Sequence, residues 1–422
     1  MNPSDREEPA PRLSRRALLA ALGSAGALTL LAGCGLRAPG PTPTPTRTPR
    51  GTPLARAPSA TPTGTPSPSG TPSVAPASRV SSMATDTPGP PTPTHTPRPT
   101  PTPTATPFPP GPPTKLGILI ARNEPHVFDF LSTGNVALVK TLEYDPTFVS
   151  DIKKLSPGSL LVARMTLPQL DLSQMSDPVA AARAFADQLL PIATEPRRLA
   201  AIDAWEGFNE VVTLDAGQME RLAEFEAERT RLLANAGVKS VIGNFGTGQP
   251  DLALWPNFRP ALEAAIKHEG YLGLHEYSAP TMQFGTPQDP LGWGSDPAQE
   301  GWLTLRYRKA YRGYLEPNGL SLPLVLTEVG IDGMVANRPG PSGKGWKDFA
   351  DYWDELGMGK DAPGNYVEQL AWYDLNLQQD SYVLGAAIFA VAAWAGWESY
   401  EILGDVEPFL AQYLSVHPLR EG

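Results

Sequence analysis

Short apolar runs alternate with longer amphipathic stretches along most of the chain, from Lys115 to the C-terminus. Such runs predict β-strands, here at residues 116–121, 136–144, 159–167, 201–209, 240–246, 271–278, 323–331 and 385–394. In the stretches between them, apolar residues recur every three or four positions, which is typical of amphipathic helices. The clearest predicted helices are at residues 178–193, 216–236, 258–269, 302–315 and 366–379.

The ends of these predicted helices carry ordinary capping signals. Asp177 and Asp215 stand where N-caps belong, and Gly237 and Gly270 stand where C-caps belong. Eight strand-then-helix units predict an α/β fold, a closed (β/α)8 TIM barrel. A doubly wound open sheet has the same alternation. It rarely keeps eight such regular units, however, and no glycine-rich nucleotide loop follows the first strand, so we favour the barrel.

The first 34 residues have the layout of an export signal. Arg15 and Arg16 precede an uninterrupted run of apolar and small residues, 17–33, that ends on Cys34. The letters SRRALL resemble a twin-arginine (Tat) signal, and LAGC resembles a bacterial lipobox, which implies that Cys34 is lipidated. The alternatives are a retained signal anchor, and a Cys34 that is only a small residue in an apolar segment. We expect an exported lipoprotein of the bacterial cell surface, held on the membrane by its lipid anchor.

Residues 35–114 are rich in alternating proline and threonine and hold about half of the chain's 49 prolines. Such a composition offers almost nothing to bury and removes backbone donors, so no core can form. We expect a disordered, extended linker here, and a single folded domain at residues 115–422.

Charge and cysteine content narrow the function classes for this domain. Residues 115–422 carry 24 basic and 40 acidic side chains, a net charge of −16, which argues against nucleic acid as a partner. The chain has one cysteine and five scattered histidines, so a disulfide or a cysteine cage cannot form within it. We expect no metal and no cofactor, with carboxylate-only metal sites left open. The oligomeric state is not indicated.

Two predicted strands end on polar side chains, the fourth on Asn209 and Glu210 and the seventh on Thr327 and Glu328. In a barrel of this kind the carboxyl ends of the strands form the functional face. Both carboxylates should therefore reach the same cleft. Two carboxylates about 5 Å apart fit retaining glycoside hydrolysis, and their repulsion raises the pKa of one of them. The alternative is that each glutamate caps a helix or pairs with an arginine.

These motifs resemble those of clan A glycoside hydrolases over the whole of residues 115–422. Trp205…Asn209–Glu210 looks like the acid/base motif and Thr327–Glu328–Val329–Gly330 like the nucleophile motif. The resemblance implies that Glu210 is the acid/base, Glu328 the nucleophile and Asn209 a donor to the sugar 2-hydroxyl. His275 and Tyr277 match a His-x-Tyr pair of the clan, and Trp394 matches the place of a sugar-stacking tryptophan.

Some positions depart from the clan pattern. Val211 stands where many members have proline, and only Arg122 and Arg164 are candidates for an arginine that many members carry near the first strands. Tryptophans in the predicted loops could stack on sugar rings or simply pack; they are Trp293, Trp346 and Trp353.

We therefore expect a retaining β-glycosidase that acts on extracellular polysaccharide or oligosaccharide. A barrel that binds glycan without cleaving it is the second hypothesis, and a structural surface lipoprotein on a stalk is the third. The distance between the Glu210 and Glu328 carboxyls discriminates the first two.

Overall fold

The computed structural model describes residues 108–289 and 299–419. The predicted export signal with Cys34, the predicted linker up to residue 107, and Trp293 lie outside the described residues. Within the described part, every helix is too short or too polar to span a lipid bilayer.

Eight parallel strands close into a barrel in the order β1 to β8, with β8 pairing back to β1. All eight predicted strands are confirmed, and with them the (β/α)8 fold. The strands are β1 (Leu116–Ile120), β2 (Leu138–Thr141), β3 (Leu160–Ala163), β4 (Ala204–Glu206), β5 (Ser240–Phe245), β6 (Tyr271–Ser278), β7 (Leu324–Ile331) and β8 (Val383–Val391).

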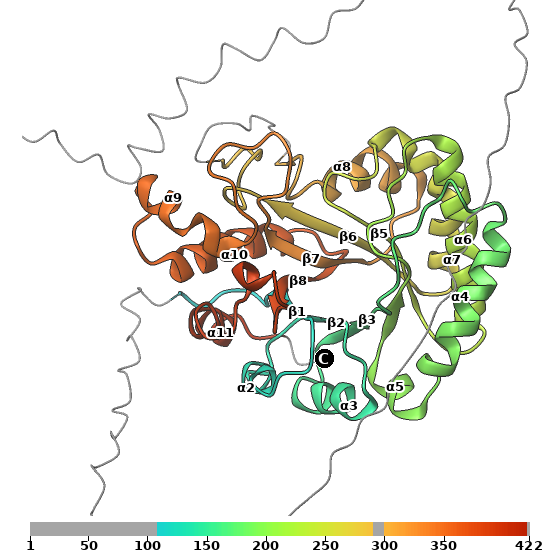
Figure 1. Cartoon of the computed structure of the whole chain (residues 1–422), viewed down its shortest axis with the longest axis horizontal. Helices are drawn as coiled ribbons and strands as arrows, with labels where there is room; N and C mark the ends of the chain where they lie inside the picture. Colours follow the sequence, from blue (N-terminus) through green and yellow to red (C-terminus); the bar gives the residue numbers. More distant parts are fainter. Residues whose placement is uncertain (1–107, 290–298, 420–422) are drawn as a thin grey trace, which may run out of the picture. The chain divides into compact units, whose positions relative to one another are not determined.

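Helices surround the sheet (Figure 1). The α-helices are α2 (His126–Leu131), α3 (Pro146–Leu155), α4 (Pro178–Ala193), α5 (Pro196–Ala201), α6 (Ala216–Ala234), α7 (Arg259–Lys267), α8 (Tyr307–Ala310), α9 (Ala350–Glu355), α10 (Ala362–Leu377) and α11 (Glu407–Ser415). Short 3-10 or π turns occur at Leu252–Phe258, Tyr311–Leu315, Glu316–Asn318, Trp346–Phe349 and Glu398–Tyr400.

Three of the four predicted helix caps agree with the structure. Asp177 and Asp215 accept hydrogen bonds from the first turns of α4 and α6. Gly237, after α6, has φ 76°, a left-handed conformation that costs glycine little. After α7 the left-handed residue is instead Glu269, with φ 53°, one position before Gly270.

The core has two parts, because successive strand residues point to opposite faces of the sheet. Outward residues pack against the helices, as Ile118 and Ile120 of β1 do. Inward residues such as Leu119 form a smaller apolar cluster within the barrel. Its buried members are Leu119, Ala121, Leu138, Leu142, Val162, Ala204, Val241, Val325, Ala387 and Ala390.

The packed part of the chain begins before Lys115, inside the segment predicted to be linker. The ring of Phe108 packs edge-on against Tyr413 of α11, with 5.1 Å between ring centroids. Gly111 N–H donates to Val416 O, and the Thr114 hydroxyl donates to Asp374 Oδ2. Residues 108–114 are thus part of the folded unit, because their backbone and side chains have partners there.

Candidate active site

Strand β4 ends at Glu206, so Asn209 and Glu210 lie in the loop that follows it rather than on the strand. Glu210 has a positive φ of 44°, which is uncommon for a residue with a side chain. Its N–H donates to Asn244 O at 3.0 Å. The amide of Gln169 donates to the carbonyls of both Asn209 (3.1 Å) and Glu210 (2.9 Å). These contacts hold Glu210 in its strained conformation.

A bulge in β7 directs Glu328 into the barrel. In the pairing with β6, Leu326 lies opposite Leu274 and Glu328 lies opposite His275, so Thr327 is an extra residue. The β7–β8 pairing has an irregularity at the same place. A bulge shifts the alternation of side chains by one position. Val325 faces inward, so strict alternation would turn Glu328, three positions later, outward. The bulge instead turns Glu328 inward.

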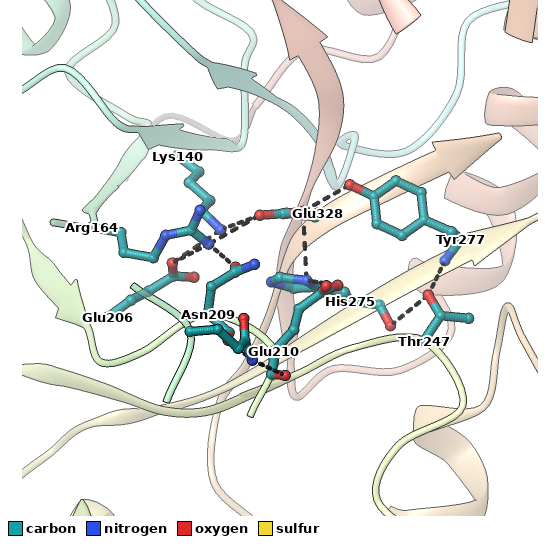
Figure 2. Close-up of polar contacts among 10 residues, drawn as sticks. Lys140, Arg164, Glu206, Asn209, Glu210, Thr247, His275, Tyr277 and Glu328 are labelled. Atoms are coloured by element: carbon teal, nitrogen blue, oxygen red, sulfur yellow. Dashed lines mark hydrogen bonds and ion pairs between the residues drawn. The ribbon is translucent and has the colours of Figure 1, made fainter. Parts of the chain in front are cut away.

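Glu328 is 6% exposed, and its carboxylate has partners on both sides. Its Oε1 accepts from Lys140 Nζ at 2.8 Å and from an Arg164 nitrogen at 3.1 Å. Its Oε2 accepts from the Tyr277 hydroxyl at 2.8 Å and lies 3.5 Å from His275 Nδ1. Figure 2 shows Lys140 and Arg164 approaching from one side and Tyr277 from the other.

His275 lies between the two glutamates. Its Nδ1 is 2.8 Å from Glu210 Oε1 and 3.5 Å from Glu328 Oε2. One oxygen from each carboxylate and a His275 ring nitrogen all lie within 4.8 Å of one another. The Glu210 side chain is 38% exposed, against 8% for Glu328. Glu210 is thus the more solvent-accessible of the two carboxylates.

Charge keeps Glu328 ionised. Burial alone would raise the pKa of its carboxyl, but electrostatic attraction from His275, Lys140 and Arg164 outweighs burial and holds that pKa well below the usual range. For Tyr277, burial and the neighbouring Glu328 carboxylate raise the pKa of the phenol. The tyrosine hydroxyl therefore stays protonated and donates to Glu328.

Of the two candidate arginines, Arg164 belongs to this site and Arg122 does not. Arg164 follows β3, donates to the side-chain oxygen of Asn209 and reaches Glu328. Arg122 is half exposed and pairs with Glu124.

A metal ion has little reason to bind among Glu210, His275 and Glu328, although they bring ligand-type atoms together. The Lys140 ammonium and an Arg164 nitrogen already lie 2.8 and 3.1 Å from Glu328. An incoming cation would meet two like charges.

The predicted sugar-stacking tryptophans separate into exposed and buried ones. Trp394 lies in the loop after β8 and is 39% exposed. Trp346 is 3% exposed, stacks on Tyr366 and donates its indole N–H to Glu401 O. Trp353 is fully buried. The prediction that Trp346 binds substrate is therefore corrected: its ring is used in packing and offers no free face.

Sequence reasoning missed Lys140 and Glu206, which are both fully buried in the barrel and form an ion pair of 3.0 Å. A signal was present, because each charge lies within a predicted strand that is mostly apolar. Trp397, 36% exposed, was also missed; its ring contacts Phe389, which in turn contacts Tyr277. Gly246 was also missed: an added Cβ there would lie 3.1 Å from Glu210 Oε1.

Comparisons with known proteins gave structural similarities only. No protein-family model matches the chain. A search of curated proteins found no match either.

Matching solved structures include a GH128 (subgroup II) endo-beta-1,3-glucanase from Pseudomonas viridiflava, 16% identical, covering 72% of this chain and 98% of that one, with a TM-score of 0.38. A second enzyme of that description, from Sorangium cellulosum, is 18% identical and covers 73% and 100% of the two chains, with a TM-score of 0.40. The beta-glucanase SdGluc5_26A from Saccharophagus degradans is 13% identical and covers 71% and 87%, also with a TM-score of 0.40.

Proposed function

We propose that this protein is a retaining β-glycoside hydrolase that acts on polysaccharide or oligosaccharide. One observation carries the proposal: a buried, ionised Glu328 and a half-exposed Glu210 bring carboxylate oxygens within 4.8 Å of each other. Retaining enzymes hold their two carboxyl groups about 5–5.5 Å apart, whereas inverting enzymes leave room for a water. No metal or cofactor is needed for this chemistry.

In this mechanism Glu328 is the nucleophile. Its carboxylate attacks the anomeric carbon, and the bond to the leaving oxygen breaks as a glycosyl–enzyme ester forms. The Tyr277 hydroxyl, at 2.8 Å, orients the carboxylate. The cations Lys140 and Arg164 keep it deprotonated before the attack.

Glu210 is the acid/base. It gives its proton to the leaving oxygen in the first step and removes one from the attacking water in the second. His275, at 2.8 Å, fixes the orientation of its carboxyl group. The Asn209 oxygen accepts from Arg164, which leaves the amide NH2 as a donor for the sugar 2-hydroxyl. Trp394 offers an exposed ring for a sugar face.

The assignment is tested by replacing each carboxylate by alanine and following hydrolysis of aryl β-glycosides. We expect Glu328→Ala to lose nearly all turnover, because no covalent intermediate can form. Glu210→Ala should lose most activity on poor leaving groups, which need a proton, and least on activated aryl groups. Added azide should give a product of retained configuration with Glu210→Ala and of inverted configuration with Glu328→Ala.

The outcomes separate the competing hypotheses. Hydrolysis at the parental rate by either variant refutes the assignment. Glycan binding by a parent that turns over no glycoside supports the non-catalytic barrel instead. Loss of folding in both variants means that these glutamates are structural.

We further propose that the protein is exported and anchored on the cell-surface membrane through a lipid on Cys34. The basic residues, the apolar run and a lone cysteine at its end support this. Cys34→Ser should release the protein from membranes or leave its signal uncleaved. Mass spectrometry that finds an unmodified Cys34 in mature, membrane-bound protein contradicts the proposal.

A further inference from the structure

A third carboxylate, Glu206, lies fully buried in the barrel and has no part in the mechanism above. It ends β4, and its side chain points into the barrel with Lys140 and Arg164 (Figure 2). Burial opposes the ionisation of Glu206, but the charges of Lys140 and Arg164 outweigh it and lower the pKa of the Glu206 carboxyl. The barrel therefore encloses a second negative charge.

Glu206 and Glu328 have the same two cations as partners. Lys140 Nζ lies 3.0 Å from Glu206 Oε2 and 2.8 Å from Glu328 Oε1. The Arg164 nitrogen lies 3.7 Å and 3.1 Å from the same two oxygens. Among the described residues, Glu206 Oε2 accepts no hydrogen bond, whereas Lys140 donates one to Glu328. Lys140 and Arg164 thus meet Glu206 as ion pairs, while they direct their hydrogen bonds to Glu328.

This division of charge affects Glu328 directly. With Glu206 ionised, two cations face two carboxylates, and the pairs balance. Without that charge, both cations would act on Glu328 alone, at contact distance and shielded from water. A carboxylate held so strongly is a weaker base and a poorer nucleophile, because its lone pairs are committed to its partners.

We propose that Glu206 is a positioning residue that shares the charge of Lys140 and Arg164 with Glu328 and so keeps Glu328 nucleophilic. This inference rests on the proposed function, in which Glu328 attacks the sugar. Glu206 touches neither substrate nor reacting atoms in that mechanism and acts only through the two cations.

Three other titratable groups of the described residues face Glu328 besides the two cations and Glu206. They are Glu210 in the loop after β4, and His275 and Tyr277 on β6, and every variant of the test leaves them unchanged.

The test measures the titration of Glu328 by carbon-13 NMR on the full chain labelled at the glutamate side-chain carboxyl. Its resonance is assigned by its loss in Glu328→Gln. We expect Lys140→Met to raise the Glu328 pKa into the measurable range. Adding Glu206→Gln to that variant should lower it again by about one pH unit or more, since Arg164 then acts on Glu328 alone. Equal Glu328 pKa values in the single and double variants would overturn the proposal.

A second pair of variants keeps the comparison possible if the first pair does not fold. If Lys140→Met does not fold, the same comparison is made between Arg164→Leu and Arg164→Leu/Glu206→Gln, in which Lys140 is the shared cation. The matched control is Glu226→Gln, because Glu226 is also a fully buried carboxylate, paired with Arg229 at 2.6 Å but outside the barrel. It should lower stability without moving the Glu328 titration.

Kinetics then separate this inference from the proposed function. If the parent hydrolyses glycosides, the acid limb of kcat/KM should shift in the same order as the NMR titration, since it reports groups of the free enzyme. NMR shifts of the expected sign in a protein that hydrolyses nothing contradict the glycosidase proposal alone. Hydrolysis with no difference between single and double variants contradicts the charge sharing alone.

Discussion

Glu210 has a backbone conformation that its own side chain disfavours, and three hydrogen bonds hold it there. Its φ is 44°, its N–H donates to Asn244 O, and Gln169 donates to its carbonyl and to that of Asn209. Strained residues persist only where their surroundings fix them, and they cluster at functional sites. The strain at Glu210 fits a residue whose carboxylate must be aimed.

Changing Gln169 to glutamate tests this positioning at the residue scale. The substitution keeps the shape but replaces the N–H donors by oxygens, which repel the two carbonyls. We expect kcat on poor leaving groups to fall about tenfold, equivalent to the loss of about 1.4 kcal/mol of hydrogen bonding. Activated aryl glycosides should be affected less, because they do not need the Glu210 proton.

The control for this prediction is Gln174→Glu. Gln174 lies on the same loop, is exposed, and donates its side-chain amide to the Ser173 hydroxyl. It introduces the same charge without touching the Glu210 backbone. An equal loss from both variants, or a Gln169→Glu loss independent of the leaving group, contradicts the positioning role.

At the scale of elements, the strands and most helices could be predicted because their apolar periodicity is regular. The same alternation placed His275 and Tyr277 on one side of β6, and both do face Glu328. The bulge at Thr327 could not be predicted, since it depends on the pairing with β6 and β8 rather than on local sequence.

The Lys140–Glu206 pair was missed for a related reason. Each charge lies in a short apolar strand, and the two are far apart in sequence. Only closure of the barrel brings them within 3.0 Å of each other. Trp346 was misjudged because a loop tryptophan can pack inward or face solvent, and the neighbouring ring of Tyr366 decides which.

Glu276 links β6 to the segment that follows it, and this link should depend on pH. Its carboxylate is buried on the outer face of β6 and accepts from Leu305 N–H, Tyr307 N–H and the Tyr373 hydroxyl. Burial raises the Glu276 pKa to about 7, despite these donors. The folded state thus binds a proton more tightly than the unfolded chain, whose glutamate pKa is about 4.5.

The difference between the folded and unfolded pKa values of Glu276 sets the direction in which stability changes with pH. As pH rises from about 4.5 to about 7, the folded state holds a proton that the unfolded state has released, so stability falls. The contribution is on the order of 3 kcal/mol across this window. Urea unfolding at pH 5 and pH 8 should show that Glu276→Gln removes this part of the pH dependence. An unchanged dependence in Glu276→Gln would falsify the assignment.

At the scale of the whole molecule, the folded unit includes residues 108–114, upstream of Lys115. Deleting residues 1–107 should leave the Tm of the barrel nearly unchanged, because the alternating proline and threonine of the predicted linker offer little to bury. Deleting residues 1–114 should lower it, since Phe108 loses its place on Tyr413 and Asp374 loses the Thr114 hydroxyl. Phe108 is partly buried, so its ring contributes less than the roughly 1.5–3 kcal/mol of a fully buried phenylalanine, and we expect a fall of a few degrees.

Calorimetry on the two truncated proteins checks this prediction. Phe108→Ala in the full chain is the finer variant, because it removes the ring alone. A large loss of Tm on deleting residues 1–107, or none on deleting 1–114, shows that the boundary is elsewhere.

The position of residues 108–114 also determines where a force on the upstream chain would reach the barrel. They lead into the start of β1 and pack beside the end of α11, whereas Glu210 and Glu328 lie towards the other ends of the strands. A force applied upstream of Phe108 therefore acts on the side of the barrel remote from the carboxylates. Among the described residues, the contacts that would bear such a force are Phe108 on Tyr413 and the backbone bonds of Gly111 and Thr114. A polymer bound at the carboxylates and a pull on residues 108–114 would therefore load opposite ends of the barrel, without competing for the same surface.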